Sequence, residues 1–115
     1  MTHAELIAAL EAATEPSREL DGKIAMLGYA PFVVHRMRED IISNAPRYTS
    51  SIDAALTLLN KVGILLSLSD IGADGLPLAI VADPTREGES TFEGIGCNLA
   101  ISLCIAALKA RETAP

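Results

Sequence analysis

Arg47-Tyr48-Thr49-Ser50-Ser51-Ile52-Asp53-Ala54-Ala55-Leu56 is the stretch that decides the fold of this chain. A guanidinium and a phenol stand directly before three hydroxyl side chains, and the apolar spacing that follows predicts a helix over about 51–61. The start of a helix has unpaired backbone N–H groups and a partial positive charge, so it can hold an anion. The same residues fit an ordinary helix cap, with Ser50 as N-cap and Asp53 as its acidic partner. The sequence leaves both interpretations open.

The region before this stretch predicts a helix in two parts. Apolar residues recur at helical spacing over about 3–27, and Pro16 breaks the run. Ser17 then follows as the expected N-cap of the second part. The run 32–34 has the composition of a strand. The stretch 36–44 fits an amphipathic helical turn as well as a strand and a loop.

The region after it predicts a β-hairpin and a final helix. Two apolar runs form the hairpin near 64–82, and its turn at 70–75 carries two glycines and two aspartates. A polar, glycine-bearing loop is expected over 85–96. The final helix is expected over 97–111 and is apolar on nearly every side. Such a helix is either central in its own domain or buried in a partner, so we expect a homo-oligomer.

These elements predict one domain over residues 1–115. The order helix, strand, helix, hairpin, helix belongs to the α+β class. Because a small antiparallel sheet cannot leave both apolar faces in water, the expected architecture is a three-layer α/β/α sandwich. The length suffices for a hydrophobic core without disulfides or metal.

Composition excludes several classes of partner. Half of the residues are hydrophobic, but only two Tyr, two Phe and no Trp are present, which argues against single-stranded nucleic acid. The net charge of −6 argues against binding a nucleic acid duplex. The longest nearly apolar run, 98–108, is too short to span a membrane. With two cysteines and no signal peptide, we expect a cytoplasmic protein of the bacterial host cell.

Three segments of the chain, taken in order, resemble the phage ABA sandwich domain of small bacteriophage and prophage proteins. They are Ser17-Arg18-Glu19-Leu20-Asp21 with Ile24-Ala25, Arg47-Tyr48-Thr49-Ser50-Ser51-Ile52-Asp53-Ala54-Ala55, and Leu103-Cys104-Ile105-Ala106-Ala107-Leu108-Lys109-Ala110. The resemblance implies an α/β/α sandwich of unknown biochemical function and transfers no catalytic residue. The chain departs from the family pattern because its hairpin strands contain no Trp, and the loop 85–96 is distinctive.

The residues best suited to a ligand belong to the opening stretch. A guanidinium, a phenol and hydroxyls at a helix start would suit a phosphate or a nucleotide. The candidate ligand-binding residues are Arg47, Tyr48, Thr49, Ser50 and Ser51, with Arg18, Gly94 and Gly96 as a secondary set.

The secondary candidates each have a structural alternative. Gly94 and Gly96 could let backbone N–H groups approach an anion, although they lack the rest of a P-loop or dinucleotide fingerprint and fit an ordinary loop. Arg18 can pair with Asp21 three residues on, or reach across to the Tyr48 region.

The sequence contains neither a complete catalytic motif nor a metal-ligand motif. His35, Asp53 and a nearby serine could be drawn as a triad, but no nucleophile elbow accompanies them. Cys97 and Cys104 show no metal-ligand spacing and are expected to be buried as small hydrophobes. We therefore expect no metal, no cofactor and no enzymatic activity.

The functional expectation is a non-enzymatic phage or prophage accessory protein, a self-associating binding module. Its expected partner is a host protein or a small anionic ligand, with a counter-defence role among the options. The alternatives are a structural or packaging-associated module, a protein that sequesters a nucleotide at Arg47–Ser51, and an enzyme acting on a phosphorylated small molecule. The residues do not decide among them.

Overall fold

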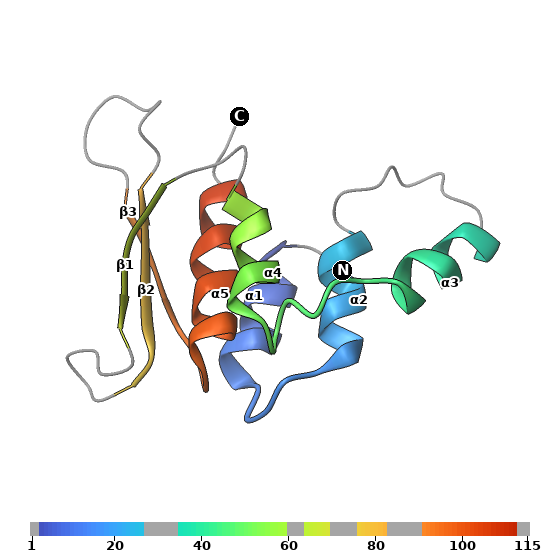
Figure 1. Ribbon diagram of the computed structural model, residues 1–115, viewed down its shortest axis with the longest axis horizontal. Coiled ribbons are helices and arrows are strands. Elements are labelled where there is room, and N and C mark those ends of the chain that lie inside the picture. Colours follow the sequence, from blue (N-terminus) through green and yellow to red (C-terminus); the bar gives the residue numbers. More distant parts are fainter. Residues whose placement is uncertain (1–2, 27–34, 60–63, 70–75, 83–90, 113–115) are drawn as a thin grey trace.

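The computed structural model describes residues 3–26, 35–59, 64–69, 76–82 and 91–112. Within these ranges the chain forms five α-helices, one short 3₁₀ helix and a three-stranded antiparallel sheet, which confirms the α+β class (Figure 1). The strand expected at 32–34 and the hairpin turn expected at 70–75 lie outside the described residues.

The amino-terminal region is a helix in two parts, as expected. Helix α1 (His3–Ala12) ends before Pro16, and α2 (Arg18–Met26) begins after it. The Ser17 hydroxyl accepts a hydrogen bond from the backbone N–H of Leu20 at 3.3 Å, which is the predicted cap. The ambiguous stretch that follows forms a helix, α3 (His35–Ser43).

The central helix is shorter than its apolar spacing predicts. Helix α4 (Ile52–Leu56) passes into the 3₁₀ turn η1 (Thr57–Leu59). Its N-cap is Ser51, whose hydroxyl accepts from Ala54 N at 3.3 Å. The prediction of Ser50 as the cap was wrong by one residue, because the extended backbone of Ser51 (φ −128°, ψ 121°) marks the boundary.

The sheet is a meander of β1 (Ile64–Ser69), β2 (Leu78–Ala82) and β3 (Thr91–Ile95), in that order. Strands β1 and β2 pair antiparallel with one irregularity of register, which confirms the predicted hairpin. The prediction of a loop throughout 85–96 was wrong, because β3 pairs antiparallel with β2. Glu93 and Gly94 lower the strand propensity of β3, and pairing with β2 overrides that preference.

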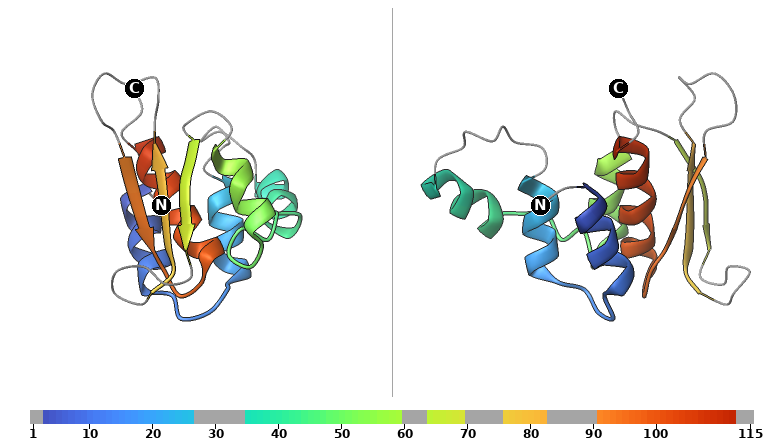
Figure 2. Two further views of the ribbon diagram at one scale, coloured as in Figure 1. Left: turned by 60° about the vertical axis from the view of Figure 1, so that its left-hand side comes forward. Right: turned by 180° about the vertical axis from the view of Figure 1, so that it is seen from behind.

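Helix α5 (Leu99–Glu112) is the central element of the fold. It packs on β2 and β3 on one side and on α1 and α4 on the other, with α2 and α3 farther from the sheet (Figures 1 and 2). Every residue from Ala100 to Leu108 is buried. Because α5 is apolar on all sides, it needs packing on all sides and takes the middle layer.

The layers of the sandwich therefore follow an order that differs from the expected one. The described helices lie on one side of the sheet, so the sheet is an outer layer instead of the middle one (Figure 2). Burial of α5 within its own chain also removes the reason for expecting a homo-oligomer. The oligomeric state itself stays a prediction.

Substitution of Gly94 by alanine should destabilise the protein. A Cβ atom at Gly94 would overlap the carbonyl oxygen of Ser102 and lie 2.7 Å from the backbone nitrogen of Ala106, so α5 would have to move from the sheet. Overpacking of this kind costs about 1–3 kcal/mol. Urea unfolding measures this loss, with Thr91→Ala on the exposed side of the same strand as control. Equal stability of Gly94→Ala and the parent would contradict this packing.

Candidate functional site

The carboxylate of Asp21 joins α2 to the opening stretch of the sequence. Its side chain is only 1% exposed, and Thr49 is fully buried. The backbone N–H and the hydroxyl of Thr49 each lie 2.8 Å from Asp21 Oδ1, and Arg18 Nη1 donates to Oδ2 at 3.0 Å. The predicted Arg18–Asp21 pair is present. The connection to the second motif runs from Asp21 to Thr49.

Thr49 also binds two other segments. The backbone N–H of Ser17 donates to Thr49 Oγ1 at 2.9 Å, and the side-chain amide of Asn98 donates to the Thr49 carbonyl oxygen at 3.1 Å. We call Ser17, Arg18, Asp21, Thr49 and Asn98 the Thr49 cluster. It brings together the start of α2, the segment before α4 and the start of α5.

Hydrogen bonding explains how the cluster tolerates a buried carboxylate. A buried ionisable group is costly unless it is paired and hydrogen-bonded. Both oxygens of Asp21 have donors, one from a guanidinium and the other from Thr49. Loss of any donor would leave part of that cost uncompensated.

The thiol of Cys104 lies close to the cluster. It donates to the carbonyl oxygen of Tyr48 at 3.3 Å. Burial, with a smaller contribution from the charge of Asp21, raises the pKa of Cys104 from 9.0 to about 12. The thiol is therefore protonated at neutral pH and unreactive there.

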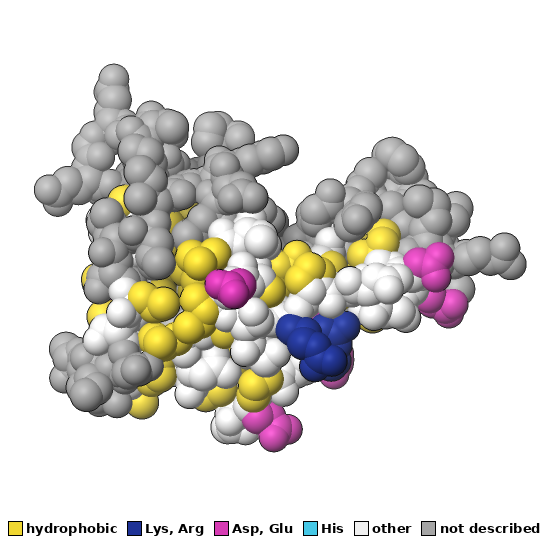
Figure 3. All heavy atoms as spheres, in the orientation of Figure 1, with side chains coloured by type: hydrophobic (Ala, Val, Ile, Leu, Met, Phe, Trp, Pro, Cys, Tyr) yellow, Lys and Arg dark blue, Asp and Glu magenta, His cyan; other side chains and the backbone are white. Residues whose placement is uncertain are grey.

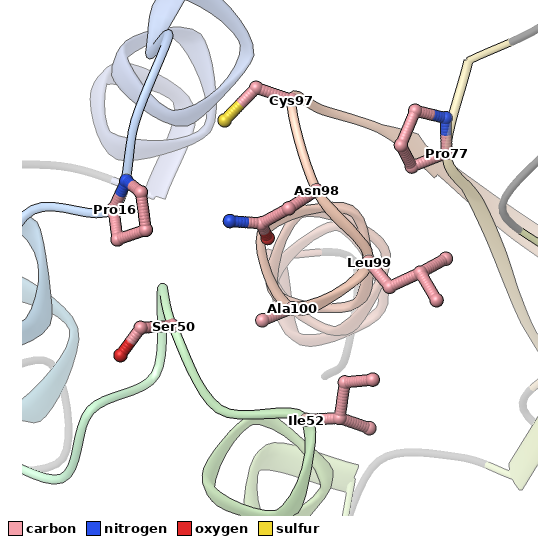
Figure 4. A pocket seen from close by; sticks show the side chains of 8 residues that line it. All are labelled: Pro16, Ser50, Ile52, Pro77, Cys97, Asn98, Leu99 and Ala100. Atoms are coloured by element: carbon pink, nitrogen blue, oxygen red, sulfur yellow. The ribbon is translucent and has the colours of Figure 1, made fainter.

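A pocket of about 370 Å³ opens beside the cluster (Figure 4). It is lined by Pro16, Ser50, Ile52, Pro77, Cys97, Asn98, Leu99 and Ala100. Pro16 and Ser50 are sequence neighbours of the cluster residues Ser17 and Thr49, and Asn98 belongs to both. The hydrogen bonds of the cluster thus hold the pocket walls that come from α5, from the segment before α4 and from the turn between α1 and α2.

The five principal candidate residues have different environments. Ser50 lines the pocket, whereas Thr49 is buried behind it and Ser51 caps α4. Tyr48 is half-buried against the core, and Arg47 is exposed. The structure therefore brings one of the five, Ser50, to the pocket.

The secondary candidates serve packing and internal bonding. Gly94 lies within β3 against α5, where its lack of a side chain permits close contact. The backbone N–H of Gly96 donates to the buried hydroxyl of Ser102 at 2.8 Å. Arg18 is paired with Asp21.

Sequence reasoning missed most of the pocket. Asn98 carried a usable signal, because an Asn before an apolar helical run is a preferred N-cap. Its Oδ1 accepts from the backbone N–H of Ile101 at 2.8 Å. Pro16, Pro77 and Ile52 carried no local signal, because distant parts of the chain bring them together.

The two cysteines differ. Cys104 is buried, as expected, whereas Cys97 is exposed at the pocket, so the expectation of burial was wrong for Cys97. The reason is position: Cys97 precedes the cap of α5 and lies outside its buried turns.

The described residues contain neither a metal-ligand cluster nor a membrane-spanning helix. No cluster of three or more His, Cys, Asp or Glu side chains there is arranged to hold a metal ion. No described helix is both long and apolar enough to cross a membrane.

Comparison with known proteins finds no match to a family model, to a curated protein or to a solved structure. The resemblance to the phage ABA sandwich domain stays a prediction from three sequence segments.

The Asp21–Thr49 contact should carry measurable coupling in a double-mutant cycle. Thr49→Val removes the hydroxyl donor from a buried carboxylate and should cost about 1.5–3 kcal/mol, the range for hydrogen bonds to charged groups. Thr49→Ser keeps the donor and serves as the control. Urea unfolding of Asp21→Asn, Thr49→Val and the double variant gives the coupling energy. Additive losses would show that the two side chains do not stabilise each other.

Thiol reactivity should separate the two cysteines. At about pH 8 the folded chain should react at Cys97 alone, and Cys104 should react only after unfolding. Because the pKa of Cys104 is higher in the folded than in the unfolded chain, its contribution to stability is present below pH 9.0 and declines as the pH rises toward about 12. Titration with a chromogenic disulfide measures the thiols, and Cys97→Ser should abolish the reaction of the folded chain. Rapid labelling of Cys104 in folded Cys97→Ser would contradict the buried position.

Proposed function

We propose that this protein is a non-enzymatic binding module whose binding site is the pocket beside Ser50 and Asn98. The observation that carries the proposal is the position of the Thr49 cluster, whose buried and part-buried hydrogen bonds hold three pocket walls together. Supporting residues of this kind keep a site in its binding geometry before the ligand arrives. The pocket volume of about 370 Å³ falls in the range of small-ligand sites.

The biological part of the proposal rests on the sequence. The resemblance to phage proteins supports an accessory role in the cytoplasm of an infected bacterium, with a host factor or small ligand as partner. A structural or packaging-associated module is the alternative. It would need no ligand in the pocket, and ligand binding therefore discriminates between the two.

An anion or nucleotide site at Arg47–Ser51 has less support. The N–H and hydroxyl of Thr49 both bind Asp21, and the Ser51 hydroxyl caps α4. Helix α4 itself has only five residues, so its macrodipole is small.

Ligand screening with a blocked-pocket variant tests the binding proposal. A compound that occupies the pocket should raise the Tm and slow alkylation of Cys97, because a ligand present at 100 times its Kd stabilises the fold by roughly 2.7 kcal/mol. The panel contains nucleotides, phosphorylated metabolites, apolar amines and short peptides.

The matched variants are Ser50→Trp, which fills the pocket from an exposed position, and Ser43→Trp, which adds the same side chain on α3. Both effects of the ligand should disappear in Ser50→Trp and persist in Ser43→Trp. A panel without any effect on Tm or alkylation would favour the structural module.

A further inference from the structure

We propose that the pocket receives an apolar side chain from a basic segment of a partner protein. This inference rests on the proposed function, because it names the ligand of the same pocket. It follows from the pocket lining, from the internal hydrogen bonds of the pocket's amide group and from the charges beside the pocket.

The lining is mainly apolar and continues onto an exposed surface. Pro16, Pro77 and Leu99 lie around the opening (Figure 4). Ile52 is 37% exposed, and Leu76, next to Pro77, is 50% exposed. Figure 3 shows hydrophobic side chains gathered on this face, over α4, α5 and the adjoining edge of the sheet. An apolar side chain entering the pocket would remove this surface from water.

The amide in the lining is already used within the protein. Asn98 donates through Nδ2 to the carbonyl oxygen of Thr49 and accepts through Oδ1 from Ile101 N. The other lining side chains that can form hydrogen bonds are the exposed hydroxyl of Ser50 and the exposed thiol of Cys97, which is a weak donor and acceptor. A strongly polar ligand would lose its bonds to water and find few side-chain replacements.

The sequence neighbours of the pocket lining that carry a charge are acidic. Glu15 precedes Pro16 and Asp53 follows Ile52; both are exposed, and no basic residue is adjacent in sequence to a lining residue. Figure 3 shows acidic side chains over α4 and over the turn between α1 and α2, at the border of the hydrophobic area, and a group of Lys or Arg side chains over α2, where Arg18 is paired with Asp21. The whole chain carries a net charge of −6. Basic residues that flank the inserted side chain would complement this border.

The start of α5 decides where the basic groups lie. The partial positive charge of a helix N-terminus disfavours a cation directly at Leu99 and Ala100. The apolar side chain therefore enters the pocket, while Lys or Arg side chains of the partner lie outside it, near Glu15 and Asp53. This arrangement resembles interfaces in which a buried apolar anchor is surrounded by a polar rim.

A second copy of this chain is a poorer occupant of the same surface. In a two-fold dimer the same patch meets itself, so the acidic borders of two copies would approach each other. Like charges brought together across an interface oppose association. Basic residues on a partner would instead attract the acidic residues at the border of the pocket.

Peptide binding to the full-length protein tests the proposal. Three sets of short fluorescent peptides are compared: Leu or Phe flanked by Lys and Arg, the same apolar residues flanked by Glu, and Ser in place of the apolar residues with Lys and Arg kept. Fluorescence anisotropy should detect binding of the first set alone. Binding should weaken at high salt and should protect Cys97 from alkylation.

Matched variants assign the binding to the pocket. Ile52→Ser should weaken the Kd by about tenfold or more, as expected for a buried interface anchor. Ile95→Ser removes an isoleucine of equal exposure, 37%, from β3 and should leave the Kd unchanged. The Glu15→Gln/Asp53→Asn pair should weaken binding and reduce its salt dependence, whereas Asp40→Asn on α3 should do neither. Urea unfolding of each variant separates loss of binding from loss of folding.

Several outcomes would overturn the inference. They are preferential binding of the acidic or the serine set, equal loss in Ile52→Ser and Ile95→Ser, and light scattering that shows a dimer abolished by Ile52→Ser. The basic apolar peptides could fail to bind while another compound protects Cys97 in the parent and not in Ser50→Trp. That result would keep the proposed binding function and overturn only the proposed class of ligand. If nothing protects Cys97, both fail.

Discussion

The buried contact between Asp21 and Thr49 is the interaction on which the site depends. A carboxylate removed from water must have its oxygens bonded, and here the donors come from a guanidinium on its own helix and from a segment 28 residues away in sequence. This requirement ties α2 to the segment before α4. The carbonyl oxygen of Thr49 accepts a hydrogen bond from the Asn98 side chain, so Thr49 also fixes the start of α5.

The second constraint is the burial of α5. Its apolar surface extends around the whole helix, so one sheet face cannot cover it. The sheet packs on one side, α1 and α4 pack on the other, and Gly94 lets β3 approach closely. The pocket lies where this helix begins, next to the hydrogen bonds of the Thr49 cluster. A packed central helix and a bonded cluster thus give a small surface hollow with walls held in place.

Sequence reasoning predicted most of the regular structure from local signals. Pro16 predicted the break between α1 and α2, and Ser17 predicted the cap of α2. Two apolar runs of sequence predicted the two strands of the hairpin. It failed at β3, where a glycine and polar residues hide a strand that exists because β2 pairs with it. It also extended the central helix too far and placed its cap one residue early, since spacing alone does not locate a helix boundary.

The sequence by itself determined the α+β class, the acidic charge and the motifs that matter, because capping, periodicity and composition are local or additive properties. Only the tertiary structure decided what those motifs do. Thr49 could have offered its N–H and hydroxyl to a ligand, but Asp21 lies within reach of both. Pro16, Ile52, Pro77 and Leu99 acquire a common surface only after folding. A pocket forms where residues that are distant in sequence come together, so no local sequence pattern predicts it.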